Sequence, residues 1–290
     1  MSTCKETKES GRTCLSKKLP TKEEIEEIKE RLALQDNLCM IKHKLIVLSG
    51  KGGVGKSTVA VYIALALSQK GKKVGLVDVD IHGPSIPKML GLEGIVPKQS
   101  PEGMEPVLYS PNLVVMSVGF LLREQDDAVI LRAPLKHGII RQFLAEVNWG
   151  ELDYLVVDCP PGTGDEPLSV IQLIEDADGA IVVTTPQDVA VADVRKSITF
   201  CSQTRLPVIG VVENMSGFAC PHCGESVDIF KSGGGERMAT EMAVPFLGRI
   251  PIDPGIVESG DSGKAFMQVY AQSAAAKAFE PVIEKLLLIN

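Results

Sequence analysis

The feature that most constrains the fold of this chain is a glycine-rich run at residues 50–58, with the sequence GKGGVGKST. It fits the phosphate-loop pattern G-x-x-x-x-G-K-[ST], which joins a buried strand to a helix. Residues 44–49 contain the apolar core Leu-Ile-Val-Leu, and a helical pattern begins at Lys56. Because the run has the context that its mechanism requires, a glycine-rich turn that matches by chance is the weaker interpretation.

The residue types in this run suit the phosphates of a nucleotide. Glycines let the backbone curl so that its N–H groups converge on phosphate oxygens, and the positive end of the next helix points at them. Lys56 would neutralise the outer phosphates, and Ser57 would ligate Mg²⁺. We expect ATP or ADP to be bound by the whole run, which consists of Gly50, Lys51, Gly52, Gly53, Val54, Gly55, Lys56, Ser57 and Thr58.

Short apolar runs alternate with helical patterns along residues 42–290. The strand candidates are residues 44–49, 74–77, 113–116, 154–157, 180–183, 208–212 and 246–250. The helical patterns are residues 56–69, 136–147, 188–201 and 236–242. This alternation predicts an α/β fold, with an open, mostly parallel twisted sheet and helices on both faces. Ligands of such folds lie beyond the carboxyl ends of the strands.

A polar extension, residues 1–41, precedes this P-loop ATPase domain. A capping-box pattern begins at Thr21, and apolar residues recur at helical spacing at Ile25, Ile28 and Leu32. We expect one amphipathic helix here. The rest of the extension is rich in Lys, Ser and Thr, a composition typical of disorder.

Composition and charge exclude several classes of partner. The net charge of -7 disfavours attraction to nucleic acid or to an anionic membrane. No apolar stretch reaches the ~20 residues that span a bilayer, and the first 44 residues contain no signal-peptide core. Seven scattered cysteines do not form the even framework of a small secreted fold. We expect a cytoplasmic protein that binds neither nucleic acid nor membrane.

Carboxylates follow two of the strand candidates, at the sheet edge that should face the phosphate loop. Asp78 and Asp80 end the second candidate, and Asp158 follows residues 154–157. The sequence PPGTG at residues 160–164 then forms a loop that we expect to sense the γ-phosphate. Helix capping or turn formation is the alternative role for a carboxylate at such a place.

A second chemical signal is the C-x-x-C turn of Cys220 and Cys223, which encloses His222. Such a turn can hold two thiolates on one metal, but zinc or an iron–sulfur cluster normally takes four protein ligands. The chain has no second C-x-x-C, and a two-fold dimer would supply the missing pair. A redox dithiol, and an intrachain zinc site that recruits His222 or another cysteine, are the alternatives.

Lys51 adds a second lysine at the start of the glycine run, so this loop resembles the deviant Walker A loop of the MinD-like ATPases. The resemblance implies that Lys51 reaches across a nucleotide-sandwich dimer to the partner's phosphates; a solvated loop cation is the alternative. By similarity, Asp80 would orient or deprotonate the attacking water. Asp78 would support the magnesium shell, and Asp158 resembles the Walker B aspartate that holds Mg²⁺ through water.

Four further segments resemble the Mrp/ApbC family of iron–sulfur cluster carriers. They are DVDIHGPS at 78–85, DCPPGTGD at 158–165, ENMSGF at 213–218 and GRIPID at 248–253, within a match over about residues 42–285. The family implies a slow ATPase that forms a homodimer, shares one [4Fe-4S] cluster between the cysteine pairs and passes it to apo iron–sulfur proteins. It also implies that Asn214, Pro251 and Asp253 flank the adenine.

The remaining cysteines depart from part of this pattern. Some relatives carry a four-cysteine cluster in an N-terminal extension, whereas this chain has only the widely spaced Cys4, Cys14 and Cys39 there. A second stable cluster is therefore not expected. Cys159 and Cys201 fit buried small apolar residues better than ligands.

Two other functions of the same fold compete with cluster carriage. A membrane-bound positioning ATPase of the MinD or ParA kind would need a basic amphipathic tail. Residues 273–290 have only Lys277 and Lys285 as cations, and we expect Pro281 to interrupt the segment. An ATP-driven electron-transfer protein like dinitrogenase reductase places its cluster cysteines on separate segments, whereas a local C-x-x-C favours an exchangeable cluster. Zinc fits four thiolates as readily as an iron–sulfur cluster does, so purified protein could contain Zn²⁺.

Overall fold

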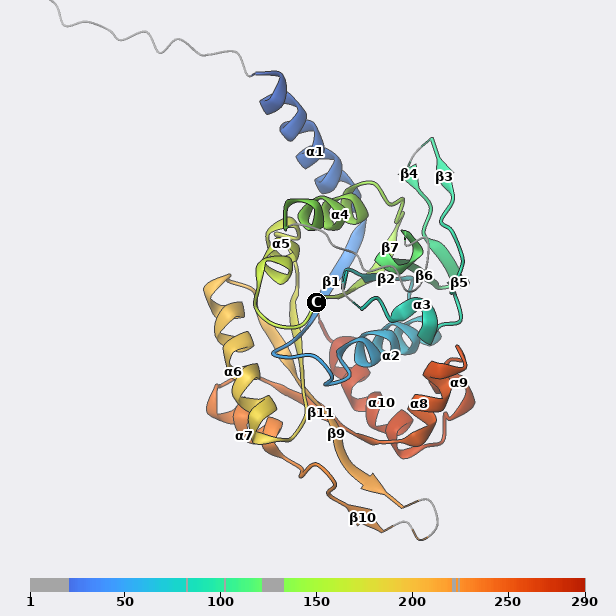
Figure 1. Ribbon diagram of the computed structural model, residues 1–290, viewed down its shortest axis with the longest axis vertical. Helices are drawn as coiled ribbons and strands as arrows, with labels where there is room; N and C mark the ends of the chain where they lie inside the picture. The colour runs from blue at the N-terminus through green and yellow to red at the C-terminus, as the bar shows by residue number, and fades with distance from the viewer. Residues whose placement is uncertain are drawn as a thin grey trace, which may run out of the picture.

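The computed structural model describes residues 21–81, 83–101, 103–121, 133–220, 223 and 225–289. Within these residues one nine-stranded sheet crosses the molecule, with β11 (Phe246–Ile252) paired to β9. The order of the other strands is β10 (Ser226–Val227), β9 (Val208–Ala219), β8 (Gly179–Thr184), β1 (Ile41–Ser49), β7 (Leu152–Asp158), β2 (Val74–Asp78), β6 (Leu113–Ser117) and β5 (Val107–Ser110) (Figure 1).

Parallel pairing dominates the sheet. The central strand β1 pairs in parallel with β7 and β8, and β2 does so with β6 and β7. Within the described part of this sheet, only the edge pairs β5–β6 and β9–β10 are antiparallel. Residues 44–49 of β1 are all buried, as expected for a parallel strand that is covered on both faces. The predicted α/β fold class is confirmed.

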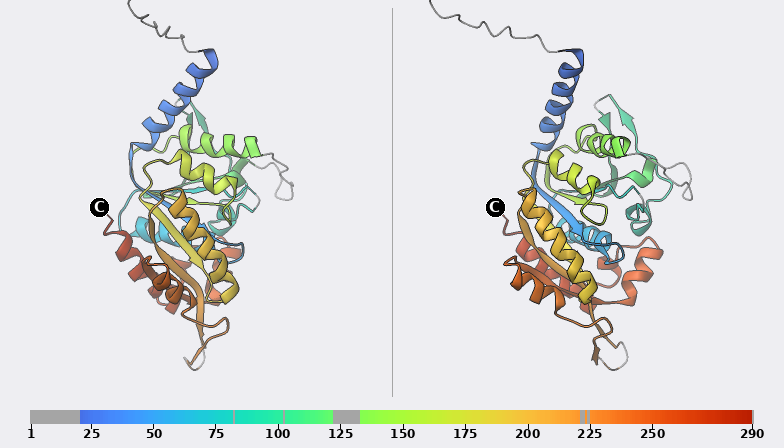
Figure 2. Two further views of the ribbon diagram at one scale, coloured as in Figure 1. Left: turned by 90° about the vertical axis from the view of Figure 1, so that its left-hand side faces the viewer. Right: turned by 60° about the vertical axis from the view of Figure 1, so that its left-hand side comes forward.

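Helices cover both faces of this sheet, as Figures 1 and 2 show. One face carries α2 (Lys56–Gln69), α3 (Ile86–Met89), α8 (Pro254–Asp261), α9 (Phe266–Val269) and α10 (Ala274–Leu286). The other carries α4 (Ala133–Ala145), α5 (Asp165–Leu173), α6 (Asp188–Gln203) and α7 (Gly234–Glu241). Right-handed crossovers explain this division, because the chain winds one way from β1 to β6 and the other way from β7 to β9.

Helix α10 corrects the interpretation of residues 273–290. Pro281 does not interrupt it, because the helix runs on to Leu286 and buries Phe279, Val282 and Ile283 against the rest of the fold. Tertiary packing of this apolar face outweighs the hydrogen bond that a proline removes. No described helix has both the length and the apolar character that a membrane crossing demands.

Helix α1 (Lys22–Leu38) is the helix expected in the N-terminal extension. Leu34 and Leu38 are buried, and the Asn37 side chain donates to two main-chain oxygens at the end of α4, at 2.8 and 2.7 Å. The three apolar residues of the predicted stripe are instead exposed by 40%, 53% and 52%, namely Ile25, Ile28 and Leu32. The division of the chain at residue 41 stays a prediction.

Three further elements complete the fold. The stretch between Leu92 and Pro111 contains a small hairpin, β3 (Gln99–Ser100) and β4 (Gly103–Met104), as well as β5. A short 3-10 helix (Val118–Leu121) follows β6. Strand β9 extends seven residues beyond its predicted end at Val212, and this extension carries the chain away from the body of the molecule (Figure 1).

Candidate functional site

The phosphate-loop run lies at the carboxyl end of β1 and leads directly into α2. Gly53 and Gly55 have φ angles of 78° and 79°, which glycine adopts without strain. A Cβ atom on Gly50 would lie 2.5 Å from the main-chain carbon of Asp193 in α6. The loop is therefore curled and closely packed, the geometry in which main-chain N–H groups can converge on phosphates.

Strand β9 touches this loop through Asn214. Its side-chain nitrogen donates to the Val54 oxygen at 2.9 Å, and a Cβ atom on Gly55 would lie 2.2 Å from the same nitrogen. Asn214 is 5% exposed, so its amide is committed to this contact. The loop and β9 are thus in direct contact.

Lys56 and Asp158 form a buried ion pair beneath the loop. The Lys56 Nζ lies 2.6 Å from Asp158 Oδ1 and 3.3 Å from Ser57 Oγ. Burial is the largest single influence and lowers the pKa of Lys56, but the charge and hydrogen bond of Asp158, together with the charges of Asp78 and Asp80, outweigh it, so the pKa is raised. Asp158 Oδ2 is buried with no hydrogen-bond partner among the described residues. The lysine is charged and the carboxylate has one oxygen available, as a phosphate and a metal shell would require.

Asp78 is fully buried beside this pair, and both of its oxygens accept hydrogen bonds. Asp80 N donates to Oδ1 at 3.1 Å, and Ser117 Oγ donates to Oδ2 at 3.0 Å. Burial raises the pKa of Asp78 to about 8, and the negative charge of Asp158 adds to this effect. Asp78 thus fixes the turn that presents the half-buried Asp80 at the sheet edge.

The PPGTG loop, residues 160–164, lies against the phosphate loop. Gly162 N donates to the Ser49 oxygen at 2.8 Å, and its φ of 93° is accessible to glycine. A Cβ atom on Gly52 would lie 4.0 Å from the Pro161 ring. This loop therefore packs against the start of the phosphate loop, and its contact with the γ-phosphate stays a prediction.

A pocket of about 390 Å³ opens beside the end of the phosphate loop, and we call it the base pocket. Its walls include Thr58, Asn214, Pro251 and Asp253, so the structure brings together the three residues predicted to flank the adenine. Asp253 also caps α8, because its Oδ1 accepts from Gly255 N at 2.9 Å. The flat base of a nucleotide could enter this pocket while the phosphates of the same nucleotide lie on the phosphate loop.

Two further wall residues of the base pocket, Met215 and Phe230, were not predicted from the sequence. Met215 has a left-handed φ of 56°, which directs β9 past the phosphate loop. Phe230 comes from the segment between β10 and α7. An aromatic residue in a short segment without a helical or strand period gives no sequence signal for such a place.

Glu213 is a third residue that the sequence pattern did not reveal. It is fully buried and accepts hydrogen bonds from Gly233 N at 2.8 Å, from Gly235 N and from Ser216 Oγ at 2.5 Å. A carboxylate suits the unpaired N–H groups at the start of a helix. Glu213 therefore ties the start of α7 to β9.

The cysteine pair lies at the outer end of β9. We call residues 216–220, 223 and 225–230 the cysteine hairpin, which projects from the body in Figure 1. Cys220 is half-buried and its N donates to the Glu225 oxygen at 2.9 Å, while Cys223 is exposed. No cluster of three or more His, Cys, Asp or Glu with metal-binding geometry occurs among the described residues, which do not include His222.

The other cysteines differ in exposure. Cys39 is exposed at the end of α1, whereas Cys159 and Cys201 are buried. Burial raises the pKa of the Cys201 thiol to about 11 and raises that of Cys159 further. Cys4 and Cys14 lie outside the described residues.

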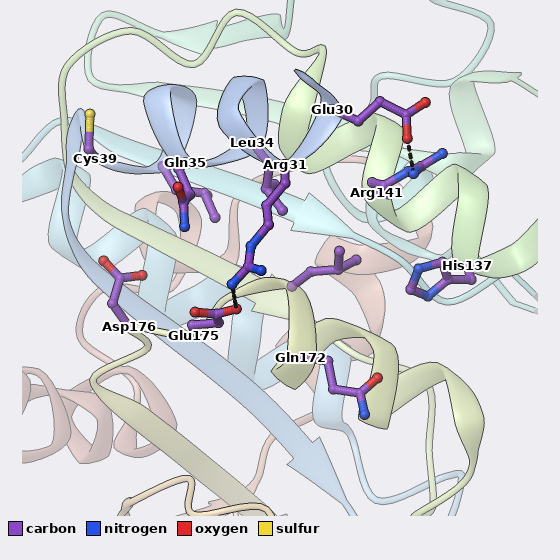
Figure 3. A pocket seen from close by; sticks show the side chains of 12 residues that line it. Glu30, Arg31, Leu34, Gln35, Cys39, His137, Arg141, Gln172, Glu175 and Asp176 are labelled. Atoms are coloured by element: carbon purple, nitrogen blue, oxygen red, sulfur yellow. Dashed lines mark hydrogen bonds and ion pairs between the residues drawn. The ribbon is translucent and has the colours of Figure 1, made fainter. Parts of the chain in front are cut away.

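A second cavity, of about 460 Å³, lies between α1, α4 and α5 (Figure 3). Arg31 pairs with Glu175 at 3.0 Å, and Arg141 pairs with Glu30. None of its wall residues belongs to the phosphate loop or the cysteine hairpin. Exposed ion pairs of this kind contribute little free energy to the packing of α1 against α4 and α5.

Comparison with known proteins now identifies the family. The pattern of the NUBPL iron-transfer P-loop NTPases, within the ParA group, matches residues 40–287. The chain belongs to this family. It is therefore a P-loop NTPase, and the resemblance to iron–sulfur cluster carriers is confirmed.

Several known proteins are similar to this chain over most of their own length and most of its length. The iron–sulfur cluster carrier protein of Methanocaldococcus jannaschii is 50% identical over 92% of this chain and 93% of its own. The cytosolic Fe-S cluster assembly factor NUBP2 of Rattus norvegicus is 50% identical over 89% and 97%. A nucleotide-binding protein from Archaeoglobus fulgidus, solved with ADP, has a TM-score of 0.75 at 42% identity over 86% and 96%.

More distant structures share the fold alone. The cell division ATPase MinD of Pyrococcus furiosus has a TM-score of 0.62 at 21% identity, over 86% of this chain and 99% of its own. At that identity the likeness supports the MinD-like architecture and leaves the positioning function without specific support.

Proposed function

We propose that this chain is an ATPase that carries a [4Fe-4S] cluster between two identical subunits and delivers it to apo iron–sulfur proteins. The observation that carries the proposal is the cysteine hairpin, which holds the half-buried Cys220 and the exposed Cys223 away from the body of the molecule. The relatives at 50% identity that are named for cluster carriage and assembly support it. The rat relative's name also supports a cytoplasmic location.

The ligand count leads to the homodimer. Cys220 and Cys223 supply two thiolates for each chain, and a cluster normally takes four. A two-fold axis at the hairpin tip would bring the same two thiols from each subunit together. Exposure at the tip suits a cargo that must be passed on. Zinc would occupy the same four thiolates in protein that lacks the cluster.

The nucleotide chemistry follows from the residues beneath the phosphate loop. On ATP binding, Lys56 would turn from Asp158, which lies 2.6 Å from its charged end, to the outer phosphates, because a charged lysine binds phosphate oxygens strongly. Ser57 and the available oxygen of Asp158 would hold Mg²⁺, which neutralises phosphate charge when bound. Asp78 would support this shell by fixing the turn that carries Asp80.

The remaining two catalytic residues act at the open side of the site. Asp80 would orient or deprotonate the attacking water, because it is half-buried at the sheet edge. Lys51 would reach the phosphates of the partner subunit. Its main-chain oxygen accepts from Ser49 Oγ at 3.0 Å, which fixes the backbone and leaves the side chain outside that contact. Slow hydrolysis would then be coupled to the dimer that carries the cluster.

Anaerobic reconstitution tests the cluster site. Wild-type protein should hold about one [4Fe-4S] cluster per dimer, measured by iron, sulfide and native mass. Cys220→Ala and Cys223→Ala should each abolish it, because the symmetric site loses two of four ligands. Cys39→Ala is the matched control, since it removes an exposed thiol outside the hairpin. A monomer with a full cluster, or retention in the Cys220→Ala/Cys223→Ala double variant, would contradict the shared site.

A further inference from the structure

Both strands of the cysteine hairpin start at the base pocket. The outgoing strand β9 supplies Asn214 and Met215 to the pocket wall, and the returning segment supplies Phe230. Cys220 comes six residues after Asn214, and Cys223 comes seven residues before Phe230. At about 3.3 Å per extended residue, each arm can span roughly 20 Å from the pocket to the thiols. One short structure therefore has the nucleotide at its base and the cysteines at its tip.

The base of this hairpin is held by buried hydrogen bonds. Glu213 accepts from Gly233 N on the returning side and from Ser216 Oγ on the outgoing side. Ser216 Oγ also lies 3.1 Å from Ser232 Oγ. These contacts link the two arms just beside Phe230. A shift of the Phe230 ring must therefore be accommodated by the hairpin rather than by slippage of one arm.

The Phe230 ring is suited to a planar base. It lines the base pocket and is still 38% exposed, so one part of its surface faces open space. Aromatic side chains stack on the flat face of a base, and this contact tolerates different bases. The phosphate loop holds the other end of the ligand, because Thr58 lies on the wall of the same pocket.

We propose that Phe230 stacks on the base of the bound nucleotide and transmits the occupancy of the phosphate-loop site to the cysteine hairpin. The stacking of Phe230 on the base is argued from the base pocket alone. Its effect on the bound cluster rests on the proposed function. By linkage, if nucleotide binding changes the affinity of the hairpin for its cluster, the cluster changes the nucleotide affinity by the same factor.

The contact with the base is tested on protein without a cluster. Phe230→Ala should weaken ADP binding about tenfold by calorimetry, as loss of one stacking contact predicts, and Phe230→Tyr should retain it. Inorganic tripolyphosphate, which has no base, should bind wild type and Phe230→Ala within twofold of each other. Ile229→Ala is the matched control, because this neighbour is 54% exposed and does not line the pocket. Unchanged ADP affinity in Phe230→Ala, or equal loss of tripolyphosphate binding, would overturn the stacking role.

The transmission is tested by comparing ADP affinity with and without a reconstituted cluster. The ratio of the two dissociation constants should depart from one by at least about fivefold in wild type, the usual lower size of such couplings. It should fall to within twofold of one in Phe230→Ala and persist in Phe230→Tyr. A ratio of one in wild type protein that holds its cluster, or an unchanged ratio in Phe230→Ala, would overturn the transmission. Failure of wild type to hold any cluster would instead overturn the proposed function and leave the stacking result standing.

Discussion

The phosphate loop and the cysteine hairpin are built in opposite ways. The loop is enclosed by its own chain, with α6 against Gly50, β9 against Gly55 and the Lys56–Asp158 pair beneath it. The hairpin extends outward, and Val227 and Ile229 on its returning arm are 50% and 54% exposed. One chain therefore arranges almost all of its nucleotide site, whereas it presents only two of the thiols that a cluster needs.

This difference separates the two sites experimentally. A defect in the enclosed loop should appear in a single chain as lost nucleotide binding or lost stability. Loss of a hairpin thiol, Cys220 or Cys223, should instead appear only in the assembled, loaded protein, because these thiols act on the shared cluster. Lys51 is the exception within the loop, because its proposed target lies on the partner. The predictions below test this separation, starting with the largest expected effect.

Lys56→Ala should abolish nucleotide binding. The variant removes the cation for the outer phosphates, and charge-assisted contacts of this kind are the strong ones. It also leaves the buried Asp158 without its partner, which destabilises a protein by about 3–5 kcal/mol. We expect at least ~100-fold weaker ADP binding by calorimetry and a lower melting temperature.

Two comparisons make the Lys56 result specific. Lys70→Ala removes an exposed lysine at the end of α2 and should leave both measurements unchanged. Adding Asp158→Asn to Lys56→Ala should restore part of the stability without restoring binding, because the unpaired charge is gone. Normal ADP affinity in Lys56→Ala would show that the loop does not bind phosphate in the proposed way.

Lys51→Ala and Asp80→Ala should lower kcat about 100-fold while ATP affinity stays near that of wild type. Both residues are proposed to act on the transition state and not on the ground state of the bound nucleotide. Steady-state hydrolysis and equilibrium ATP binding measure the two quantities separately. Mixing Lys51→Ala with a hydrolysis-defective Asp80→Ala chain should restore part of the activity, because mixed dimers contain one intact pair. Normal hydrolysis by Lys51→Ala would refute the trans-acting lysine.

Gly50→Ala should destabilise the fold more than Gly53→Ala. At Gly50 the new Cβ atom would meet main-chain atoms of α6 at 2.5 to 2.7 Å, and a helix backbone cannot move aside cheaply. We expect a loss of about 3 kcal/mol, typical of overpacking. At Gly53 there is open space, so only the positive φ of 78° costs about 1 kcal/mol. Urea unfolding of the two variants measures the difference, and equal losses would contradict the enclosed loop.

The sequence anticipated the enclosed part of the molecule well. All seven predicted strands are present, and the pattern for residues 56–69 coincides with α2. Buried parallel strands and the phosphate loop have strong local signals, because burial on both faces demands uninterrupted apolar residues. Asn214, Pro251 and Asp253 were also predicted to lie together, and they line one pocket. That prediction came from the family resemblance and not from the hydrophobic pattern.

The sequence anticipated the hairpin and its surroundings less well. Strand β9 was expected to end at Val212, but it continues to Ala219 through Glu213 and Asn214, whose polar side chains break the apolar run. Their partners are main-chain groups distant in the sequence, such as the oxygen of Val54. Phe230 gave no signal for a similar reason. Its place in the base pocket follows from tertiary contacts that no local period records.

The last prediction concerns the reactivity of the thiols. It needs no variant and so causes the smallest change to the protein. At pH 8, Cys39 and Cys223 should react with iodoacetamide within minutes, since both are exposed. Cys201 should not, because burial raises its pKa to about 11 and only about one thiol in a thousand is ionised at that pH. Cys159 should be protected for the same reason. Peptide mass spectrometry, before and after unfolding in urea, measures each site.

The same labelling experiment on protein that holds a cluster or zinc compares the cysteine hairpin with the rest of the molecule. A bound cluster or zinc ion should protect the thiols of Cys220 and Cys223, because coordinated sulfur is not a free nucleophile, and it should leave Cys39 as reactive as before. ADP alone should not protect the hairpin thiols, since the phosphate loop and the cysteines are separate sites. Protection of Cys39 by the cluster would mean that the extension takes part in the site. Rapid labelling of Cys201 in folded protein would show that the body of the molecule opens as readily as its projecting hairpin.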